Sequence, residues 1–337
     1  MEIKFLKAGK GDAILVSSNG EHMLVDGGDD TTYLFKELDV IYNKGESINC
    51  LVVTHHDSDH INGILELFKE LNNNRYGVAK DFIKRIYFNS PRLFLGKKIS
   101  TGSNQLSYKQ AYQLEEKICE LDILWDQLLT EKSNIFNIGS FSVNCLSPTD
   151  DIVDSYSNNS GAYLSSLSEG DWGKSLEDLS KYVSDKKLDK SPPNESSIVL
   201  EVESDNFRTL LTADITPKRL AQVLSDLFNR NDNKLLQYNF FKLPHHGCHR
   251  NITKEILSKI ACDKYFISTD GNNHYLPNKK TILKVLDGRI KPEGTTEFYF
   301  NYQGVIDKLQ ITEVETKKGK FELIGNNKDY GYCFSAI

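Results

Sequence analysis

The sequence predicts a mixed α/β protein whose strands end in polar loops that lead into helices. Two segments carry this prediction, because in each an apolar run ends directly in a cluster of histidines and helical spacing then resumes. The first is Cys50–Thr54, followed by a helix over Ile61–Leu71, and the second is Tyr238–Leu243, followed by a helix over Ile252–Ile260. A continuous apolar run bounded in this way is typical of a strand buried on both faces.

The other elements are predicted from the same two signals. Short apolar or alternating runs indicate strands, and apolar residues spaced three and four apart indicate helices. The predicted strands are Ile3–Leu6, Ala13–Ser17, His22–Asp26, Arg85–Phe88, Ser140–Leu146, a pair within 196–213, and Lys264–Ser268; the predicted helices are Thr31–Tyr42, Tyr108–Glu120, Pro217–Leu227 and Thr281–Leu286. We expect one domain over 1–337, with a polar insertion at 150–193 that is partly helical and a small β-rich C-terminal extension at 290–337.

Composition limits the class of protein. With 41 Lys+Arg and 47 Asp+Glu the net charge is −6, which argues against a nucleic-acid coat or a basic membrane-surface protein. The sequence contains no apolar run of the roughly 18 residues that a membrane helix needs, so we expect no membrane association. Six cysteines without a C-x-x-C pair, and charges where a signal peptide would be apolar, predict a cytoplasmic protein with reduced thiols.

Six of the eight histidines lie in two clusters, at 55–60 and 245–249. The first cluster belongs to the segment THHDSDHING at 54–63, which holds four potential metal ligands: His55, Asp57, Asp59 and His60. A tight loop can direct the first two toward one metal ion and the last two toward a second. Imidazole and carboxylate together suit Zn²⁺ or Mn²⁺, so we expect two divalent metal ions. The alternative is a polar loop with chance histidines.

Three further segments place a candidate side chain at the end of an apolar run. Asp214 ends LLTAD at 210–214, where it either bridges two metals or caps the following helix. His246 lies in LPHHG at 243–247, beside His245, which either contacts a substrate phosphate and protonates the leaving oxygen or supports the site from outside. Asp26, in VDGG at 25–28, is expected to orient a ligating histidine.

In this order, DGG, T-H-x-D-x-D-H-x-x-G, LLTAD and LPHHG resemble the motifs of the metallo-β-lactamase fold. The aspartate at 57 and the opening GKGDA at 9–13 are similar to the branch that contains the nuclease domain of the competence protein ComEC, and teichoic-acid phosphorylcholine esterases share the HHG element. The resemblance covers about residues 1–290, with 72–193 matching poorly. It implies a four-layer αββα sandwich with a two-metal site at one edge of the paired sheets.

The resemblance also implies roles by position. The implied ligands are His55 and Asp57 for the first metal, Asp59, His60 and His246 for the second, and Asp214 as the bridge. Where many family members have a further histidine this chain has Asn194, either a weak ligand of the first metal or a loop-end residue that satisfies backbone groups. Ala213 stands where glycine is usual. His274, shifted relative to a late family motif, joins Asp59 and His245 as a candidate catalytic residue.

Together these observations predict a phosphodiesterase or nuclease in which a hydroxide bridging two metals attacks the phosphorus. DNA or RNA is the expected substrate, and the basic and aromatic side chains within 80–98 either hold such a strand or form an ordinary solvated face. Two alternatives stay open: hydrolysis of a small ester, lactone or phosphocholine, and a metal-site subunit of a larger complex, since stand-alone members of this branch resemble components of phage-defence gene sets. A basic cleft beside the metals favours the nuclease, and a narrow apolar pocket favours the small ester.

Overall fold

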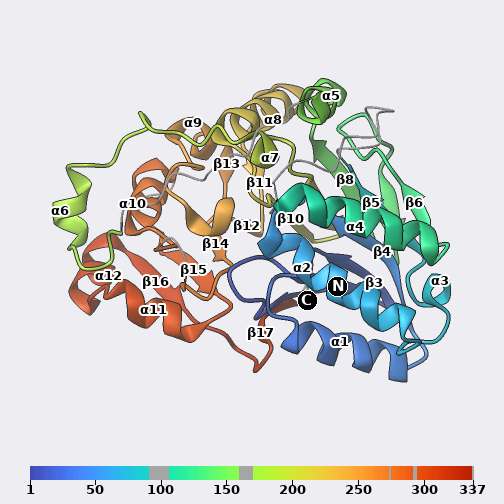
Figure 1. Cartoon of the computed structure of the whole chain (residues 1–337). Helices are drawn as coiled ribbons and strands as arrows, with labels where there is room; N and C mark the ends of the chain where they lie inside the picture. Colours follow the sequence, from blue (N-terminus) through green and yellow to red (C-terminus); the bar gives the residue numbers. More distant parts are fainter. Residues whose placement is uncertain (91–105, 159–169, 273–274, 291–293, 336–337) are drawn as a thin grey trace.

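Two large sheets lie face to face in the computed structural model, and helices cover the outer face of each (Figure 1). The structure describes residues 1–90, 106–158, 170–272, 275–290 and 294–335. The order of layers is helices, sheet, sheet, helices, so the predicted four-layer αββα class is confirmed. None of the helices in the described ranges combines the length and the apolar character of a membrane span.

The first sheet has the strand order β17-β1-β2-β3-β4-β5-β6. Its strands are β1 (Glu2–Leu6), β2 (Ile14–Ser18), β3 (Glu21–Val25), β4 (Ser47–Val53), β5 (Arg85–Phe88), β6 (Leu124–Asp126) and β17 (Gly331–Ser335). Strands β17, β1, β2 and β3 pair antiparallel, whereas β3 to β6 pair in parallel. The carboxyl ends of β3 and β4 therefore share one edge of the sandwich.

The second sheet has the order β16-β15-β14-β12-β10-β9-β8-β7. Its strands are β7 (Phe136–Ile138), β8 (Phe141–Ser147), β9 (Val199–Ser204), β10 (Phe207–Leu211), β12 (Phe240–Lys242), β14 (Lys264–Ile267), β15 (Thr296–Phe300) and β16 (Phe321–Ile324). Strands β10, β12, β14, β15 and β16 run in parallel. A separate short pair consists of β11 (Leu236–Gln237) and β13 (Ile260–Ala261).

The helices divide between the two outer faces. The first sheet is covered by α1 (Thr32–Asn43), α2 (Ser58–Asn72), α3 (Ala79–Phe82) and α4 (Leu106–Glu120); the second is covered by α8 (Pro217–Arg230), α9 (Lys254–Leu257), α10 (Lys279–Gly288) and α11 (Gln303–Leu309). The remaining helices are α5 (Asp150–Asn158), α6 (Leu176–Ser180), α7 (Pro192–Glu195), α12 (Glu313–Gly319) and the 3₁₀ turn η2 (His245–Gly247). Helix α9 is shorter than predicted because Thr253 caps its start and Ile260 already belongs to β13.

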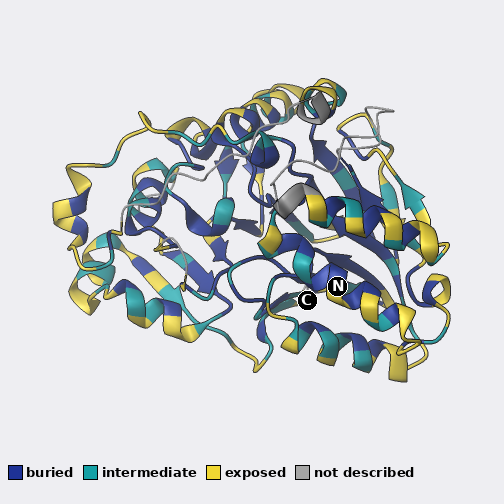
Figure 2. Cartoon of the chain, in the orientation of Figure 1, coloured by how far each residue is buried: buried dark blue, intermediate teal, exposed yellow. Residues whose placement is uncertain are grey.

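Alternating side chains give the molecule three apolar layers. In β4, Leu51 and Val53 pack against α1 and α2, whereas Cys50 and Val52 pack against the second sheet. This is the two-residue period of a strand with both faces covered, and it explains the continuous apolar run in the sequence. Figure 2 shows the strands largely buried and the outer helix faces exposed.

The C-terminal segment differs from the expected small β-rich extension. Strands β15 and β16 complete the second sheet, and β17 pairs with β1 at the edge of the first. Two helices, α11 and α12, lie between β15 and β16 in sequence. An alternation with a period of two residues predicts a strand, but it does not predict which strand it pairs with. The sequence therefore could not show that β15 and β16 join the second sheet and that β17 joins the first.

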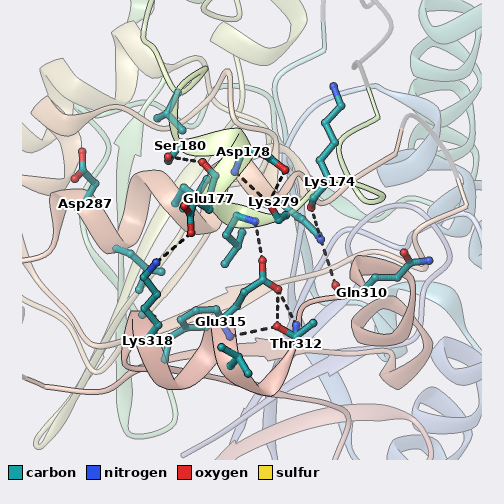
Figure 3. Close-up of a pocket in the computed structure, with 18 of the residues that line it drawn as sticks. Lys174, Glu177, Asp178, Ser180, Lys279, Asp287, Gln310, Thr312, Glu315 and Lys318 are labelled. Atoms are coloured by element: carbon teal, nitrogen blue, oxygen red, sulfur yellow. Dashed lines mark hydrogen bonds and ion pairs between the residues drawn. The ribbon is translucent and has the colours of Figure 1, made fainter.

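Part of the polar insertion is held against the C-terminal half of the molecule. The buried Lys279 of α10 donates from Nζ to the carbonyl oxygens of Lys174, at 2.8 Å, and Gln310, at 3.3 Å. The N–H of Leu176 donates to Glu315 Oε1 at 2.7 Å. Figure 3 shows these contacts in the wall of a cavity of about 890 Å³. Helix α6 therefore has a defined position beside α10 and α12.

Candidate metal centre

Side chains able to ligate a metal ion lie where strands of both sheets end. Parallel neighbours β3 and β4 are followed by Asp26 and His55, and parallel neighbours β10 and β12 are followed by Asp214 and His246. Because parallel strands end at a common edge, residues distant in sequence meet there. The first turn of α2 adds two further candidates at the same edge.

Close backbone approach fixes the start of α2. The N–H of Gly27 donates to the carbonyl oxygen of His60 at 2.9 Å. A Cβ at Gly63 would overlap the carbonyl oxygen of Gly27, and a Cβ at Gly11 would overlap that of Asp59. The glycines of the DGG, H-x-x-G and GKGD motifs thus let three backbone segments touch, which places His60 and Asp59 at the edge of the sheets.

Two overlapping groups of three side chains present ligand atoms to a common space. The atoms of each group lie within 4.8 Å of one another, and the groups are His55–His60–Asp214 and Asp59–His60–His246. The carboxylate of Asp214 joins them, since Oδ1 is 3.4 Å from His60 Nε2 and Oδ2 is 3.3 Å from His246 Nε2. We call these five residues the metal centre. They are five of the six ligands predicted from the sequence.

Four buried atoms of the metal centre have no hydrogen-bond partner: Nε2 of His55, His60 and His246, and Oδ1 of Asp214. An unpaired buried polar atom costs about 1–3 kcal/mol, so four of them together call for an explanation. Imidazole nitrogen and carboxylate oxygen are the donors that Zn²⁺ and similar divalent ions accept. The residues present therefore fit a divalent metal site.

Outer contacts determine which nitrogen of two histidines faces the centre. Nδ1 of His60 donates to Asp26 Oδ2 at 2.8 Å, and Nδ1 of His246 donates to the carbonyl oxygen of Ser268 at 2.9 Å. In the neutral rings the proton therefore lies on Nδ1, and Nε2 keeps its lone pair toward the centre. Asp26 is itself held by the N–H and hydroxyl of Thr54, at 2.8 and 2.6 Å, so it lies where an orienting residue was expected.

The carboxylates make the metal centre attractive to positive charge. Burial lowers the pKa of His60, but Asp214 and Asp26 outweigh this effect and raise it well above its usual value. The same balance between burial and the nearby carboxylates raises the pKa of His246 to about 10. By contrast, burial and the neighbouring His60 hold the pKa of His55 well below its usual value. The carboxylates around the centre thus favour a positive charge at this place.

Asp57 lies beside the metal centre. It immediately precedes α2, its side chain is 37% exposed, and its Oδ2 is 3.8 Å from His55 Nε2. Among the described residues no group of three ligand atoms includes it. Its role as a ligand of the first metal therefore stays a prediction.

His245 lies at the mouth of the metal centre with its side chain 22% exposed. Its Nε2 is 3.8 Å from Asp214 Oδ2, and its Nδ1 is 3.4 Å from Asp189 Oδ2. Asn194 donates from Nδ2 to Asp189 at 2.7 Å and lies 3.3 Å from His245 Nδ1, so it contacts this histidine and not the ligand groups. Burial lowers the pKa of His245, but Asp214 and Asp189 raise it overall. Sequence analysis missed Asp189 because carboxylates are common in the polar insertion.

A buried ion pair next to the metal centre was also missed. Asp12 contacts Nζ of Lys242, both residues are buried, and Nζ also donates to the carbonyl oxygen of Ala213 at 3.0 Å. Oδ1 of Asp12 has no hydrogen-bond partner, and Asp12 forms a further ligand group with Asp214 and His246. A lysine inside an otherwise apolar strand was the available signal, since such a residue needs a buried counter-charge.

One predicted feature lies outside the described residues and another is only partly described. His274 lies outside the described residues, as do positions 91–98 of the basic segment. In the described part of that segment, Lys80 pairs with Asp122 at 2.7 Å and Arg85 pairs with Asp126 at 2.8 Å. Exposed pairs of this kind are typical of an ordinary solvated face and not of a strand-binding surface.

The layers and the metal centre together define a protein with the metallo-β-lactamase fold. The sequence model described as the metallo-beta-lactamase superfamily matches residues 6–92, which include Asp26, His55 and His60. This match covers β2 to β5 and helices α1 to α3, and thus three of the five residues of the metal centre. No curated protein sequence matches the chain.

Several solved structures are similar to the whole chain. The metallo-beta-lactamase fold protein YhfI from Bacillus subtilis is 11% identical, with a TM-score of 0.44 and 99% of each chain covered. Zn²⁺-bound PqqB from Methylobacterium extorquens is 11% identical, with a TM-score of 0.46 and 100% of each chain covered. Igni18, a metallo hydrolase from Ignicoccus hospitalis, is 12% identical, with a TM-score of 0.42 and 100% of each chain covered. Likenesses at this level carry no information about substrate.

Loading the metal centre is expected to stabilise the fold. A ligand at about 100 times its Kd adds roughly 2.7 kcal/mol to the native state, which corresponds to a Tm increase of about 5 °C or more for a chain of this size. Differential scanning fluorimetry of EDTA-treated protein with added Zn²⁺ or Mn²⁺ measures the shift. His60→Ala should abolish it, whereas His22→Gln, at the opposite end of β3 from Asp26, should retain it. A shift of equal size in both variants would contradict the assignment of the centre.

Asp26→Asn is expected to weaken metal binding about 10- to 100-fold, because it removes the charge that orients and polarises His60. Asparagine suits this position, since Asp26 has a left-handed φ of 57° that Asn tolerates well. Titration with a competing chelator measures the affinity, and circular dichroism checks the fold. An unchanged affinity in a folded variant would show that Asp26 serves only the structure.

Proposed function

We propose that the protein is a metal-dependent phosphodiester hydrolase that acts on nucleic acid, related to the branch of the ComEC nuclease domain. The observation that supports this proposal is the convergence of three unpaired buried Nε2 atoms, those of His55, His60 and His246, on the carboxylate of Asp214 at the edge where strands of both sheets end. A carboxylate placed in this way suits a bridge between two divalent ions, Zn²⁺ or Mn²⁺. When bound, such ions supply an activated water and stabilise charge on a phosphoryl group.

The chain itself orients the groups around that chemistry. His55, with Asp57 beside it, would hold one ion, while Asp59, His60 and His246 would hold the other. Asp26 and the carbonyl of Ser268 keep two of the imidazole rings in one tautomer and one orientation. Rigid outer contacts of this kind reduce the reorganisation that a reaction would otherwise require.

His245 is the proposed group that contacts the substrate. It is partly exposed at the mouth of the metal centre, and Asp189 fixes its ring through Nδ1. Nε2 therefore points toward Asp214 and the space between the ligand groups. A protonated ring in this position can donate a hydrogen bond to a phosphate oxygen and then a proton to the leaving oxygen.

An anionic substrate is favoured over a carboxylic ester by the positive charge next to the metal centre. In addition to His245, five lysines and one arginine lie in the lining of a second cavity near the end of η2. The lining of this second cavity differs from the narrow apolar pocket that a small ester would favour. His274 stays a candidate on the substrate side.

The test combines metal analysis of the purified protein with cleavage assays. The substrates are single- and double-stranded DNA, RNA and bis-p-nitrophenyl phosphate, each with Zn²⁺ or Mn²⁺ added and with EDTA. Metal-dependent hydrolysis of the small phosphodiester and of at least one nucleic acid is expected. If no metal binds and no hydrolysis occurs, the proposal is wrong; if only carboxylic esters are cleaved, the small-ester alternative replaces it. Co-purification of a stoichiometric partner would instead support the subunit alternative.

A further inference from the structure

A second cavity, of about 790 Å³, lies between the segment after α6 and the turn that follows η2. Tyr182 also lines it, and its acidic lining among the described residues is Asp178. The described cations that line it are Lys174, Lys181, Lys186, Lys187, Arg250 and Lys280. We refer to it as the basic cavity. In a chain with a net charge of −6, such a concentration of one sign creates a local field that attracts anions.

The lysines of the basic cavity have no neutralising partner among the residues that the structure describes. In the described part of the chain none of their five ammonium groups forms an ion pair with a carboxylate. The nearby Asp185 is engaged by Lys284 at 2.7 Å, and Asp178 accepts a hydrogen bond from Ser175 at 2.7 Å. The larger cavity in Figure 3 differs, because there Lys318 pairs with Glu177 at 3.2 Å. Within the described ranges, the five unpaired lysines thus distinguish the basic cavity.

The basic cavity borders the metal centre. The N–H of Asp189 donates to the carbonyl oxygen of Arg250, and the carboxylate of Asp189 lies 3.4 Å from Nδ1 of His245. Lys187 is two residues before Asp189, so the Cα atoms of these two residues are at most about 7 Å apart. Arg250 is four residues after His246, so their Cα atoms are at most about 14 Å apart. In Figure 1 the segment between α6 and α7 runs past α9 to α7.

An exposed aromatic ring adds a second kind of recognition. Tyr182 lines the basic cavity and is 69% exposed, so its ring is accessible to a ligand in this cavity. Proteins that hold single-stranded nucleic acid combine lysines along the phosphates with aromatic rings on which unpaired bases stack. A duplex offers no free base face to such a ring. We propose that the basic cavity binds one nucleic-acid strand, with its phosphates on the lysines and a base on Tyr182, and leads it to the metal centre.

Cleavage of the bound strand rests on the proposed function, but the binding itself does not need metal ions. Fluorescence anisotropy of a labelled single-stranded oligonucleotide with the full chain in EDTA therefore measures binding separately. Lys186→Ala/Lys187→Ala is expected to weaken binding about tenfold or more and to reduce the slope of log K against log salt by about 1.4, since each phosphate contact contributes about 0.7. The matched control is Lys36→Ala/Lys44→Ala, which removes the same charge from exposed positions on and just after α1.

The stacking contact has its own readout. Tyr182→Ala is expected to weaken binding at least about fivefold without changing the salt slope, and Tyr182→Phe should retain binding. Tripolyphosphate serves as a second probe, because it offers phosphate charge without bases. If it binds as tightly as the oligonucleotide and Tyr182→Ala has no effect, the cavity binds small polyphosphates and the strand assignment is overturned.

The inference and the proposed function fail in different ways. If wild-type protein does not bind the oligonucleotide, or the two lysine pairs weaken binding equally, the inference is overturned even when the metal-loaded protein hydrolyses bis-p-nitrophenyl phosphate. If the oligonucleotide binds as expected but no phosphodiester is cleaved with any metal, the inference stands and the proposed function fails.

Discussion

Asp59→Asn or His60→Ala is expected to lower kcat/KM for bis-p-nitrophenyl phosphate by about 10³-fold or more. Both side chains belong to one ligand group, and His60 is shared by the two groups. Loss of a ligand removes several kcal/mol of transition-state charge stabilisation, and about 4 kcal/mol corresponds to a 10³-fold rate change. Initial rates at saturating Mn²⁺ or Zn²⁺ measure the effect.

The matched control for this experiment is Asp205→Asn. Asp205 is an exposed carboxylate in the turn before β10, whereas Asp214 follows the other end of the same strand. Asp205→Asn removes one charge without touching the metal centre, so its activity should equal that of the wild type. Retention of activity in a metal-depleted His60→Ala protein would place the chemistry elsewhere in the chain.

Lys242→Met is expected to lower the free energy of unfolding by about 3–5 kcal/mol, because it leaves the carboxylate of Asp12 buried without its counter-charge. Lys242 is fully buried, so neither solvent nor a nearby surface cation can replace it. Urea denaturation in EDTA measures the effect on the fold without a contribution from bound metal.

The double variant Lys242→Met/Asp12→Leu separates the ion pair from packing. Removing both charges often restores most of the stability lost by removing one, so the double variant should be more stable than Lys242→Met alone. Should the double variant be the less stable of the two, the packing of the lysine stem and not its charge would explain the loss.

Local patterns in the sequence were sufficient for most of the secondary structure. The run at Cys50–Thr54 is continuous because both faces of β4 are covered, and this is visible without any tertiary information. The predicted helices Thr31–Tyr42 and Pro217–Leu227 end within three residues of α1 and α8. In these two segments the helical spacing of apolar residues is a stronger signal than the helix propensities of the single residues.

The polar insertion shows where local patterns stop being informative. Asp189 is one of many carboxylates in that segment, yet it is the one that reaches His245. Its neighbours Lys186 and Lys187 belong to an ordinary charged stretch by composition, and only the fold turns them toward a shared cavity. The chemical role of such a residue depends on its burial and on the side chains packed around it. Neither property can be predicted from a short stretch of sequence.

By itself the sequence determined the α/β order, the strand ends that carry candidate ligands, and the choice of His55, Asp59 and His60, which lie within five residues of one another, as such candidates. Only the tertiary structure decided that Asp12 meets Lys242, 230 positions later, and that β17 closes the first sheet against β1. Local elements follow from side-chain period and turn chemistry, which act over a few residues. Long-range partners follow from the packing of two sheets, which depends on the whole chain at once.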